Sequence, residues 1–121
     1  MSESTTQQAL RLAASRAGAR VWRNNVGACT AIDGRVIRYG LCNDSAALNR
    51  SLKSADLIGI QPVLIAPHHV GTTLGVFVSV ECKAERGRVD PAQEAWRDLI
   101  LSLGGRAAIL RAPEWPQDWT G

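Results

Sequence analysis

The sequence predicts an α/β fold in which a mixed β-sheet is flanked by helices, with its elements in the order αβββαβ. Apolar residues recur at helical spacing near both ends of the chain, around Leu10 and around Leu99. Between them lie short apolar runs bounded by turn residues, which is the pattern of β-strands. With 121 residues the chain is long enough for one core, so we expect a single domain over residues 1–121.

The composition narrows the classes of protein to consider. Hydrophobic residues make up 45% of the chain and charged residues 21%, as in a folded protein rather than a disordered one. The net charge of +3 is mildly basic and by itself indicates no partner. The three cysteines (Cys29, Cys42 and Cys82) form no C-x-x-C pair, so we expect free thiols in a reducing compartment and find little support for a zinc site. The polar start and the lack of an apolar run of about 18 residues favour neither secretion nor membrane insertion.

The first predicted helix covers residues 4–17. Its small and apolar residues follow helical spacing from Leu10 to Ala17. Ser4 and Gln7 have the spacing of a capping box, and Gly18 is a suitable residue to end the helix.

A β-hairpin is predicted after this helix. An extended segment begins at Val21, and the dipeptide Asp33-Gly34 between two apolar pairs is a strong signal for a two-residue turn. Residues 43–54 are polar and form either a short helix or a surface loop. Residues 56–60 then form a short buried strand.

The second half begins with the main strand, residues 74–83, on which Cys82 is expected to face the core. Asp90-Pro91 opens the clearest helix, with an acid at the N-cap and proline in the first helical position. One apolar stripe follows and includes Trp96, which we therefore place in the core. A final strand over residues 106–111 precedes a tail that carries Trp115 and Trp119.

The residues that could perform chemistry lie where two predicted strands meet water. Glu81 and Lys83 point to the same face because side chains alternate along a strand. Asp56 precedes the other strand, and two nearby carboxylates need a shared proton or a cation. Mg²⁺ prefers such oxygen ligands, and the backbone carbonyl of Cys82 could add another. Lys83 would stabilise charge beside an attacking water.

Structural explanations compete with each of these assignments. Strands often end in charged residues, and this explains either acid alone, or Lys83 alone, better than function does. The combination of the two acids and the lysine reverses that preference. Gln93 could complete a capping box with Asp90 or reach the sheet end, and spacing alone favours the cap.

Several other residues have weaker functional interpretations. Arg86 and Arg88, close to the proposed site, could bind backbone phosphates, as could Arg23 and Arg38 on the hairpin, or all four could simply keep the surface soluble. The adjacent His68 and His69 are best explained as residues of a loop or a subunit contact. Trp115 and Trp119 could cover a domain edge or a partner subunit.

These residues, in this order, resemble the motifs of the PD-(D/E)xK nuclease superfamily, and within it the small stand-alone VRR-NUC proteins of phages and bacteria. The resemblance covers nearly the whole chain. It rests on Glu3, Trp22-Arg23-Asn24-Asn25 with Gly27, Ala55-Asp56-Leu57-Ile58-Gly59, Glu81-Cys82-Lys83, and Gly87-Arg88 through Asp90-Pro91-Ala92-Gln93. One departure is that Ala55 stands where the superfamily has proline, a position that shapes the backbone and supplies no ligand.

The resemblance implies a restriction-endonuclease-like core and a Mg²⁺- or Mn²⁺-dependent DNA endonuclease. It implies that Asp56 and Glu81 bind the metal, with Glu3 as a supporting acid, that Lys83 assists the nucleophile, and that Gln93 is an additional active-site residue. It further implies a homodimer that cuts branched DNA such as a four-way (Holliday) junction, which agrees with the need for two sites related by a two-fold axis. The expected location is the cytoplasm of a bacterium or of a phage-infected host.

Two alternatives remain open. The chain could be a catalytically inactive module that binds branched DNA, or a nuclease of other specificity that acts on flaps, on DNA ends or as a restriction enzyme. Product mapping on branched, nicked and linear substrates would distinguish among them.

Overall fold

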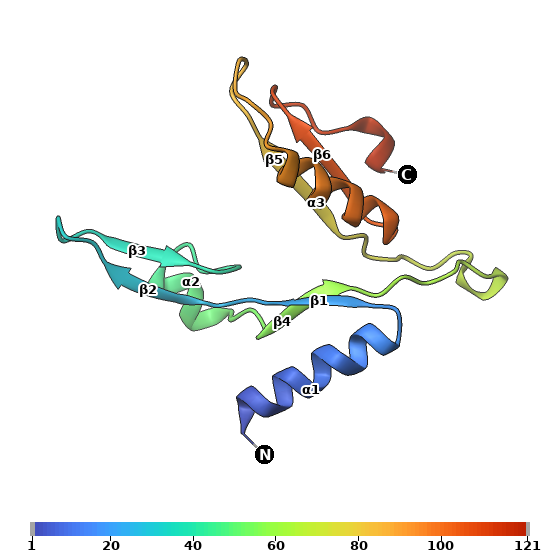
Figure 1. The fold of residues 1–121 in the computed structure, drawn as a ribbon, viewed down its shortest axis with the longest axis horizontal. Helices are drawn as coiled ribbons and strands as arrows, with labels where there is room; N and C mark the ends of the chain where they lie inside the picture. Colours follow the sequence, from blue (N-terminus) through green and yellow to red (C-terminus); the bar gives the residue numbers. More distant parts are fainter. Residues whose placement is uncertain (1, 121) are drawn as a thin grey trace. The chain divides into compact units, whose positions relative to one another are not determined.

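The computed structural model describes residues 2–120, in which the chain belongs to the α/β class (Figure 1). The elements in chain order are α1 (Glu3–Arg16), β1 (Arg20–Arg23), β2 (Gly27–Thr30), β3 (Val36–Tyr39), α2 (Ala46–Ser51), β4 (Leu57–Ile60), the 3₁₀ turn η1 (Pro67–His69), β5 (Val78–Cys82), α3 (Pro91–Ser102), β6 (Arg106–Leu110) and the 3₁₀ turn η2 (Gln117–Thr120). Within this part of the chain, no helix combines the length and the apolar character that a membrane crossing requires.

The strands form small sheets. Those that the structure describes pair as β1 with β4, β2 with β3, and β5 with β6, and the expected single mixed sheet stays a prediction. The chain divides into two compact units, an N-terminal unit that ends at Gly59 and a C-terminal unit that begins at Ile60. The expectation of a single domain stays a prediction.

Helix α1 begins earlier than the sequence pattern indicates. The N-cap is Ser2, whose side-chain oxygen accepts a hydrogen bond from the backbone N–H of Thr5 over 3.1 Å. The predicted capping box of Ser4 and Gln7 is therefore wrong, because both residues lie inside the helix. The predicted end is confirmed: Gly18 follows the C-cap with a left-handed φ of +83°.

The predicted hairpin is formed by β2 and β3, which pair antiparallel from Gly27 opposite Tyr39 to Thr30 opposite Val36. Its turn is one residue longer than predicted. Ala31 N–H donates to the carbonyl of Arg35, and Gly34 N–H donates to the carbonyl of Ala31. A two-residue type I′ turn needs positive φ at both central residues, but in the Asp33-Gly34 pair only the glycine adopts it, so the chain uses a three-residue loop.

A buried asparagine holds the base of this hairpin. Asn43 is only 3% exposed, and its amide nitrogen donates to the carbonyls of Gly27 and Tyr39 over 2.7 and 2.8 Å. Its side-chain oxygen accepts from Arg38 Nη2 over 2.7 Å. The neighbouring polar segment, left open between helix and loop, contains the short helix α2, which is capped by Ser45.

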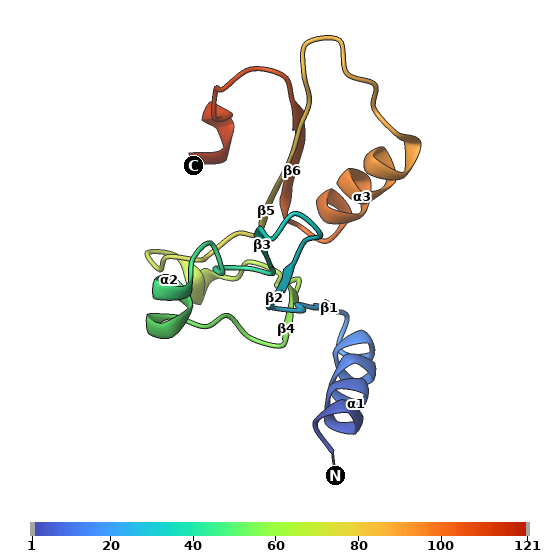
Figure 2. The same ribbon diagram turned by 90° about the vertical axis from the view of Figure 1, so that its left-hand side faces the viewer.

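The C-terminal unit contains a β–α–β arrangement. Strands β5 and β6 run parallel, from Val78 opposite Arg106 to Cys82 opposite Leu110, and α3 connects them. Ile100 of α3 is fully buried. In Figure 2, α3 lies on one side of this strand pair and the chain after β6 lies on the other.

Three expectations for this unit are wrong in detail. Strand β5 is shorter than residues 74–83, because its partner begins at Arg106 and offers no backbone to pair with residues 74–76. The side chain of Cys82 is exposed, since it lies on the face away from α3. Trp96 is 39% exposed, and its indole N–H donates to the hydroxyl of Ser79 instead of entering the core.

Candidate active site

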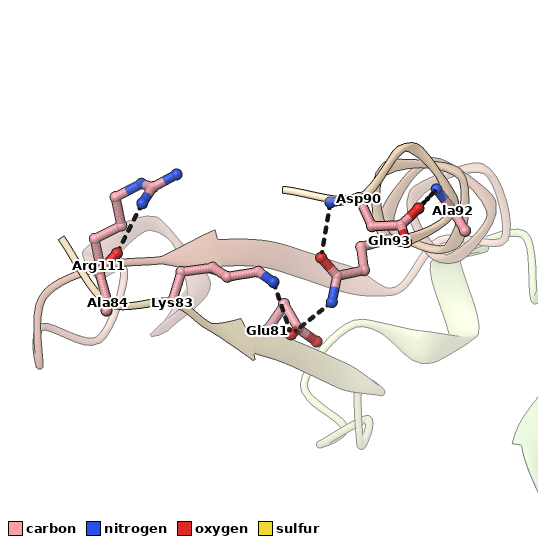
Figure 3. Close-up of polar contacts among 7 residues, drawn as sticks. All are labelled: Glu81, Lys83, Ala84, Asp90, Ala92, Gln93 and Arg111. Carbon is pink, nitrogen blue, oxygen red and sulfur yellow. Dashed lines mark hydrogen bonds and ion pairs between the residues drawn. The ribbon is translucent and has the colours of Figure 1, made fainter. Parts of the chain in front are cut away.

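Glu81 and Lys83 form an ion pair at the end of β5, as their shared face predicts (Figure 3). Lys83 Nζ lies 3.8 Å from Glu81 Oε1. The side chain of Lys83 is only 18% exposed, whereas that of Glu81 is 43% exposed. A lysine that merely ends a strand in water would be far more exposed, so this environment weakens the solubility interpretation of Lys83. The glutamate remains open to a ligand from solvent.

Gln93 performs both tasks that were considered for it, the cap that its spacing favours and the contact with the end of the strand. Its side-chain oxygen accepts a hydrogen bond from the backbone N–H of Asp90 over 3.0 Å and completes the capping box of α3. Its side-chain nitrogen donates to Glu81 Oε1 over 2.8 Å (Figure 3). The cap fixes the orientation of the amide, because a flipped amide would bring two N–H donors together at Asp90. The helix start therefore aims a donor at the carboxylate.

A cavity of about 220 Å³ opens beside this cluster, between α3 and the β5–β6 pair. Glu81 and Gln93 line it, together with Trp96 and Arg97 of the same helix. The polar end of the cluster thus borders a concave space that is otherwise lined mainly by apolar atoms.

Arg111 supports the loop that follows Lys83, a role that the sequence analysis missed. From the end of β6, its Nη1 donates to the carbonyls of Ala84 over 2.8 Å and Glu85 over 3.1 Å. Because β5 and β6 are parallel, their carboxyl ends lie at the same edge, and this relation could have indicated the contact. The loop continues to Arg86 and Arg88, which are both exposed.

The backbone carbonyl of Cys82 has a suitable direction for a ligand. In a parallel pair, alternate residues direct both backbone groups to the same neighbour. Phe77 accepts from Arg106, and Lys83 donates to Leu110, so residues of odd number in β5 face β6. The carbonyl of Cys82 consequently points to the opposite edge of β5.

In the N-terminal unit, Asp56 lies immediately before β4 and is exposed. It borders a cavity of about 360 Å³ whose lining also includes Glu3 and Gln7 of α1. The structure therefore brings Glu3 to the same cavity as Asp56, although more than fifty residues separate them in the sequence. Gln7, which was expected to serve as a cap, lines this cavity instead.

Asn24 holds the backbone on which Asp56 stands. Its amide nitrogen donates to Ser54 Oγ over 2.8 Å and to the carbonyl of Ala55 over 2.9 Å. Its side-chain oxygen accepts from the N–H of Leu41, and its own N–H donates to the carbonyl of Asp56. In the sequence, Asn24 stands out only as part of the motif Trp22-Arg23-Asn24-Asn25. Its short polar side chain directly after β1 was the available signal.

The remaining arginines with a predicted DNA contact differ in their environments. Arg23 is exposed at the end of β1. Arg38 is bound to Asn43 through Nε and Nη2, so its guanidinium serves the hairpin. A phosphate contact by either residue stays a prediction.

The histidine pair and the tryptophan pair, for which the sequence left the role open, form local contacts. His69 Nδ1 accepts from the N–H of Ala66 over 2.9 Å, which makes it part of the η1 turn, and its ring lies 4.0 Å from that of His68. Trp115 and Trp119 meet edge to face, with their ring centroids 5.1 Å apart. Both pairs are therefore held by neighbours in their own segment.

The candidate residues fall into two sets, each within one unit. Glu81, Lys83 and Gln93 are in direct contact, and Glu3 and Asp56 border one cavity. Among residues 2–120 there is no group of three or more His, Cys, Asp or Glu side chains suited to a metal. The available ligand atoms are carboxylate and backbone carbonyl oxygens, which suit Mg²⁺ or Mn²⁺ and not a soft metal. Binding of one cation by both Asp56 and Glu81 stays a prediction.

Comparisons of the chain with protein-family models, with curated proteins and with solved structures gave no match.

Proposed function

We propose that this protein is a Mg²⁺- or Mn²⁺-dependent DNA endonuclease that hydrolyses phosphodiester bonds on a restriction-endonuclease-like core. The observation that carries the proposal is the contact of Glu81 with both Lys83 and Gln93 at the rim of a cavity. A half-exposed carboxylate beside a largely buried lysine side chain is an arrangement that phosphate chemistry can use. Solubility of the surface does not require it.

Each residue has a defined task in this proposal. Asp56 and Glu81, with the backbone carbonyl of Cys82 and with Glu3 nearby, would hold the cation. The cation would polarise the phosphate and favour the hydroxide form of a bound water. Lys83 would offset the negative charge that develops as water oxygen bonds to phosphorus and the bond to the leaving oxygen breaks. Gln93 would keep the Glu81 carboxylate in a fixed orientation.

The proposed substrate is branched DNA, with a homodimer that places two such sites on a four-way junction. A symmetric junction needs two cuts related by a two-fold axis, and one chain of this size supplies one site. Arg86 and Arg88, exposed on the loop that Arg111 holds, and Arg23 at the end of β1 would contact backbone phosphates.

Cleavage of a substrate panel tests the proposal. Labelled four-way junctions, flaps and linear duplexes are incubated with Mn²⁺ or Mg²⁺ and the wild-type protein, Glu81→Gln or the matched control Glu85→Gln. We expect junction cleavage that requires the metal and falls by about 10²-fold or more in Glu81→Gln, because a neutral amide of the same shape replaces the carboxylate. Glu85 is an exposed acid in the next loop, so its variant should cut normally.

Equal cutting by Glu81→Gln would refute the site. Junction binding without cleavage under either metal would favour the inactive DNA-binding module. Preferential cleavage of flaps, ends or linear DNA would keep the chemistry and replace the substrate.

A further inference from the structure

A long segment without charged residues joins β4 to β5. From Leu57 to Val80 the chain has no Asp, Glu, Lys or Arg, so all 14 basic and all 11 acidic residues lie outside it. Apart from the short turn η1, residues 61–77 belong to no helix or strand. In Figure 1 this segment leaves β4, reaches η1 and returns to β5. We call residues 61–77 the apolar arm.

The arm exposes large aliphatic side chains. Leu64 is 91% exposed and Val70 is 81% exposed. About half or more of the surface of four further residues is also exposed, namely Val63, Ile65, Leu74 and Val76. Single exposed aliphatic residues are normal in proteins, but a contiguous uncharged group of them marks an interaction surface.

The two limbs of the arm also border a groove. This groove has a volume of about 510 Å³, and its floor includes the end of α3 and the glycines that follow. No charged side chain lines it; its lining includes Val63, Leu64, Leu74 and Phe77 of the arm and residues 102–105 at the end of α3 and just after it. The C-terminal unit therefore has both exposed aliphatic side chains and an apolar groove in which such side chains can be buried.

We propose that the apolar arm is a self-association surface, which packs against the arm and groove of a second copy of this chain. A surface without charges offers no partner for a charge that is buried against it, so it favours a partner surface that is equally uncharged. Within this sequence, the uncharged run is the arm itself and its flanking strands. A two-fold axis would bring the arm of each copy to the groove of the other, which is a closed, isologous interface.

The number of residues in this surface is sufficient for an interface with a second copy of the chain. A specific interface takes about 20–30 residues from each side. The 17 residues of the arm and the four groove residues 102–105 come to that number. The interface would therefore be of ordinary size.

The molar mass in solution tests the proposal. It is measured by light scattering and sedimentation over a dilution series for the wild type, Leu64→Lys and Val70→Lys, with circular dichroism as a check on folding. We expect a wild-type dimer whose Kd rises roughly tenfold or more in either variant, because a lysine there would be desolvated without a partner. The control Ile32→Lys changes a fully exposed aliphatic residue at the hairpin tip and should leave Kd unchanged.

Two results would overturn the proposal: a wild-type monomer at every concentration, or two folded arm variants that dimerise as tightly as the wild type. A monomer in which residues 61–77 are nevertheless protected from hydrogen exchange would assign the arm to its own chain instead. The proposal rests on the homodimer of the proposed function, and a monomer would remove that homodimer too. Metal-dependent cleavage and its loss in Glu81→Gln are measured separately, so the failure of the nuclease chemistry and the failure of this surface are distinguishable.

Discussion

Glu81 and Gln93 are joined by a hydrogen bond of 2.8 Å, which connects the end of β5 to the first turn of α3. The same glutamine amide accepts from the N–H of Asp90, so one side chain both starts the helix and restrains the carboxylate. Because a helix start is rigid, it fixes the donor with respect to the strand. The contact links a local capping signal to the chemistry that we propose.

Substitutions of Gln93 should separate these two tasks. Gln93→Ala removes the cap and the Glu81 contact, so we expect a loss of stability of about 1 kcal/mol and a lower cleavage rate. Gln93→Glu can still accept from Asp90 N–H and keeps the cap, while its charge repels Glu81, so the helix start should be retained and the cleavage rate should fall. Urea denaturation and single-turnover cleavage measure the two effects. If Gln93→Glu cuts as well as the wild type, the amide has no role at the site.

Asn24→Ala should destabilise the segment that carries Asp56. The change removes three side-chain hydrogen bonds, to Ser54, Ala55 and Leu41, and we expect a loss of about 1–3 kcal/mol. Denaturant unfolding followed by circular dichroism measures it. Asn49→Ala is the control, because within residues 2–120 the side chain of Asn49 has a hydrogen bond to the exposed Lys53 alone. Similar losses in both variants would contradict the role of Asn24.

Asn43→Ala should cost more than most asparagine substitutions. It would leave the carbonyls of Gly27 and Tyr39 without their side-chain donor and remove a partner of Arg38, for an expected loss of about 2–3 kcal/mol. Thermal and urea unfolding measure the change. A variant as stable as the wild type would show that the hairpin base does not need this residue.

Gly59→Ala should disturb the pairing of β4 with β1. A Cβ atom at this position would overlap the carbonyl oxygen of Arg20 and lie 2.6 Å from Val21 Cα, and backbone atoms cannot move aside without breaking the pair. We expect a loss of about 1–3 kcal/mol. Gly75→Ala is the matched control, because nothing lies within 4 Å of its added Cβ. Unfolding midpoints that agree for the two variants would refute the close approach.

Arg86 and Arg88 should contribute to DNA affinity through phosphates. In the double variant to alanine, the slope of log K against log salt concentration should become less steep by about 0.9 for each phosphate that the protein no longer neutralises. Fluorescence anisotropy with a labelled junction at several salt concentrations measures the slope. Arg16→Ala, at the end of α1, is the control for a general loss of positive charge. An unchanged slope in the double variant would remove both arginines from the interface.

Local signals in the sequence predicted much of the secondary structure. Asp90-Pro91 correctly marked the start of α3, and Gly18 correctly marked the end of α1, because capping depends on residues within one turn. The alternation of side chains correctly placed Glu81 and Lys83 on one face of β5. The position of the turn at Asp33-Gly34 was predicted correctly. Its length was predicted wrongly, because the φ angle of Asp33 depends on the whole hairpin.

Contacts between distant segments were not predictable in the same way. The polar residue after β1 and the shared edge of β5 and β6 were only general signals, and neither specified that Asn24 would bind the backbone before Asp56 or that Arg111 would bind the loop after Lys83. The exposure of Cys82 was mispredicted because an apolar strand face is buried only if another element covers it. Burial depends on which elements meet, and a periodic pattern in one strand carries no information on that.

The sequence by itself determined the α/β class, the main helix boundaries and the shared face of Glu81 and Lys83, because these depend on backbone geometry over a few residues. Only the tertiary structure decided that Lys83 is largely buried, that Gln93 binds Glu81 while capping α3, and that Glu3 borders the cavity of Asp56. The physical reason is that hydrogen bonds and burial depend on distances in space, which side chains far apart in the sequence acquire only when the chain folds.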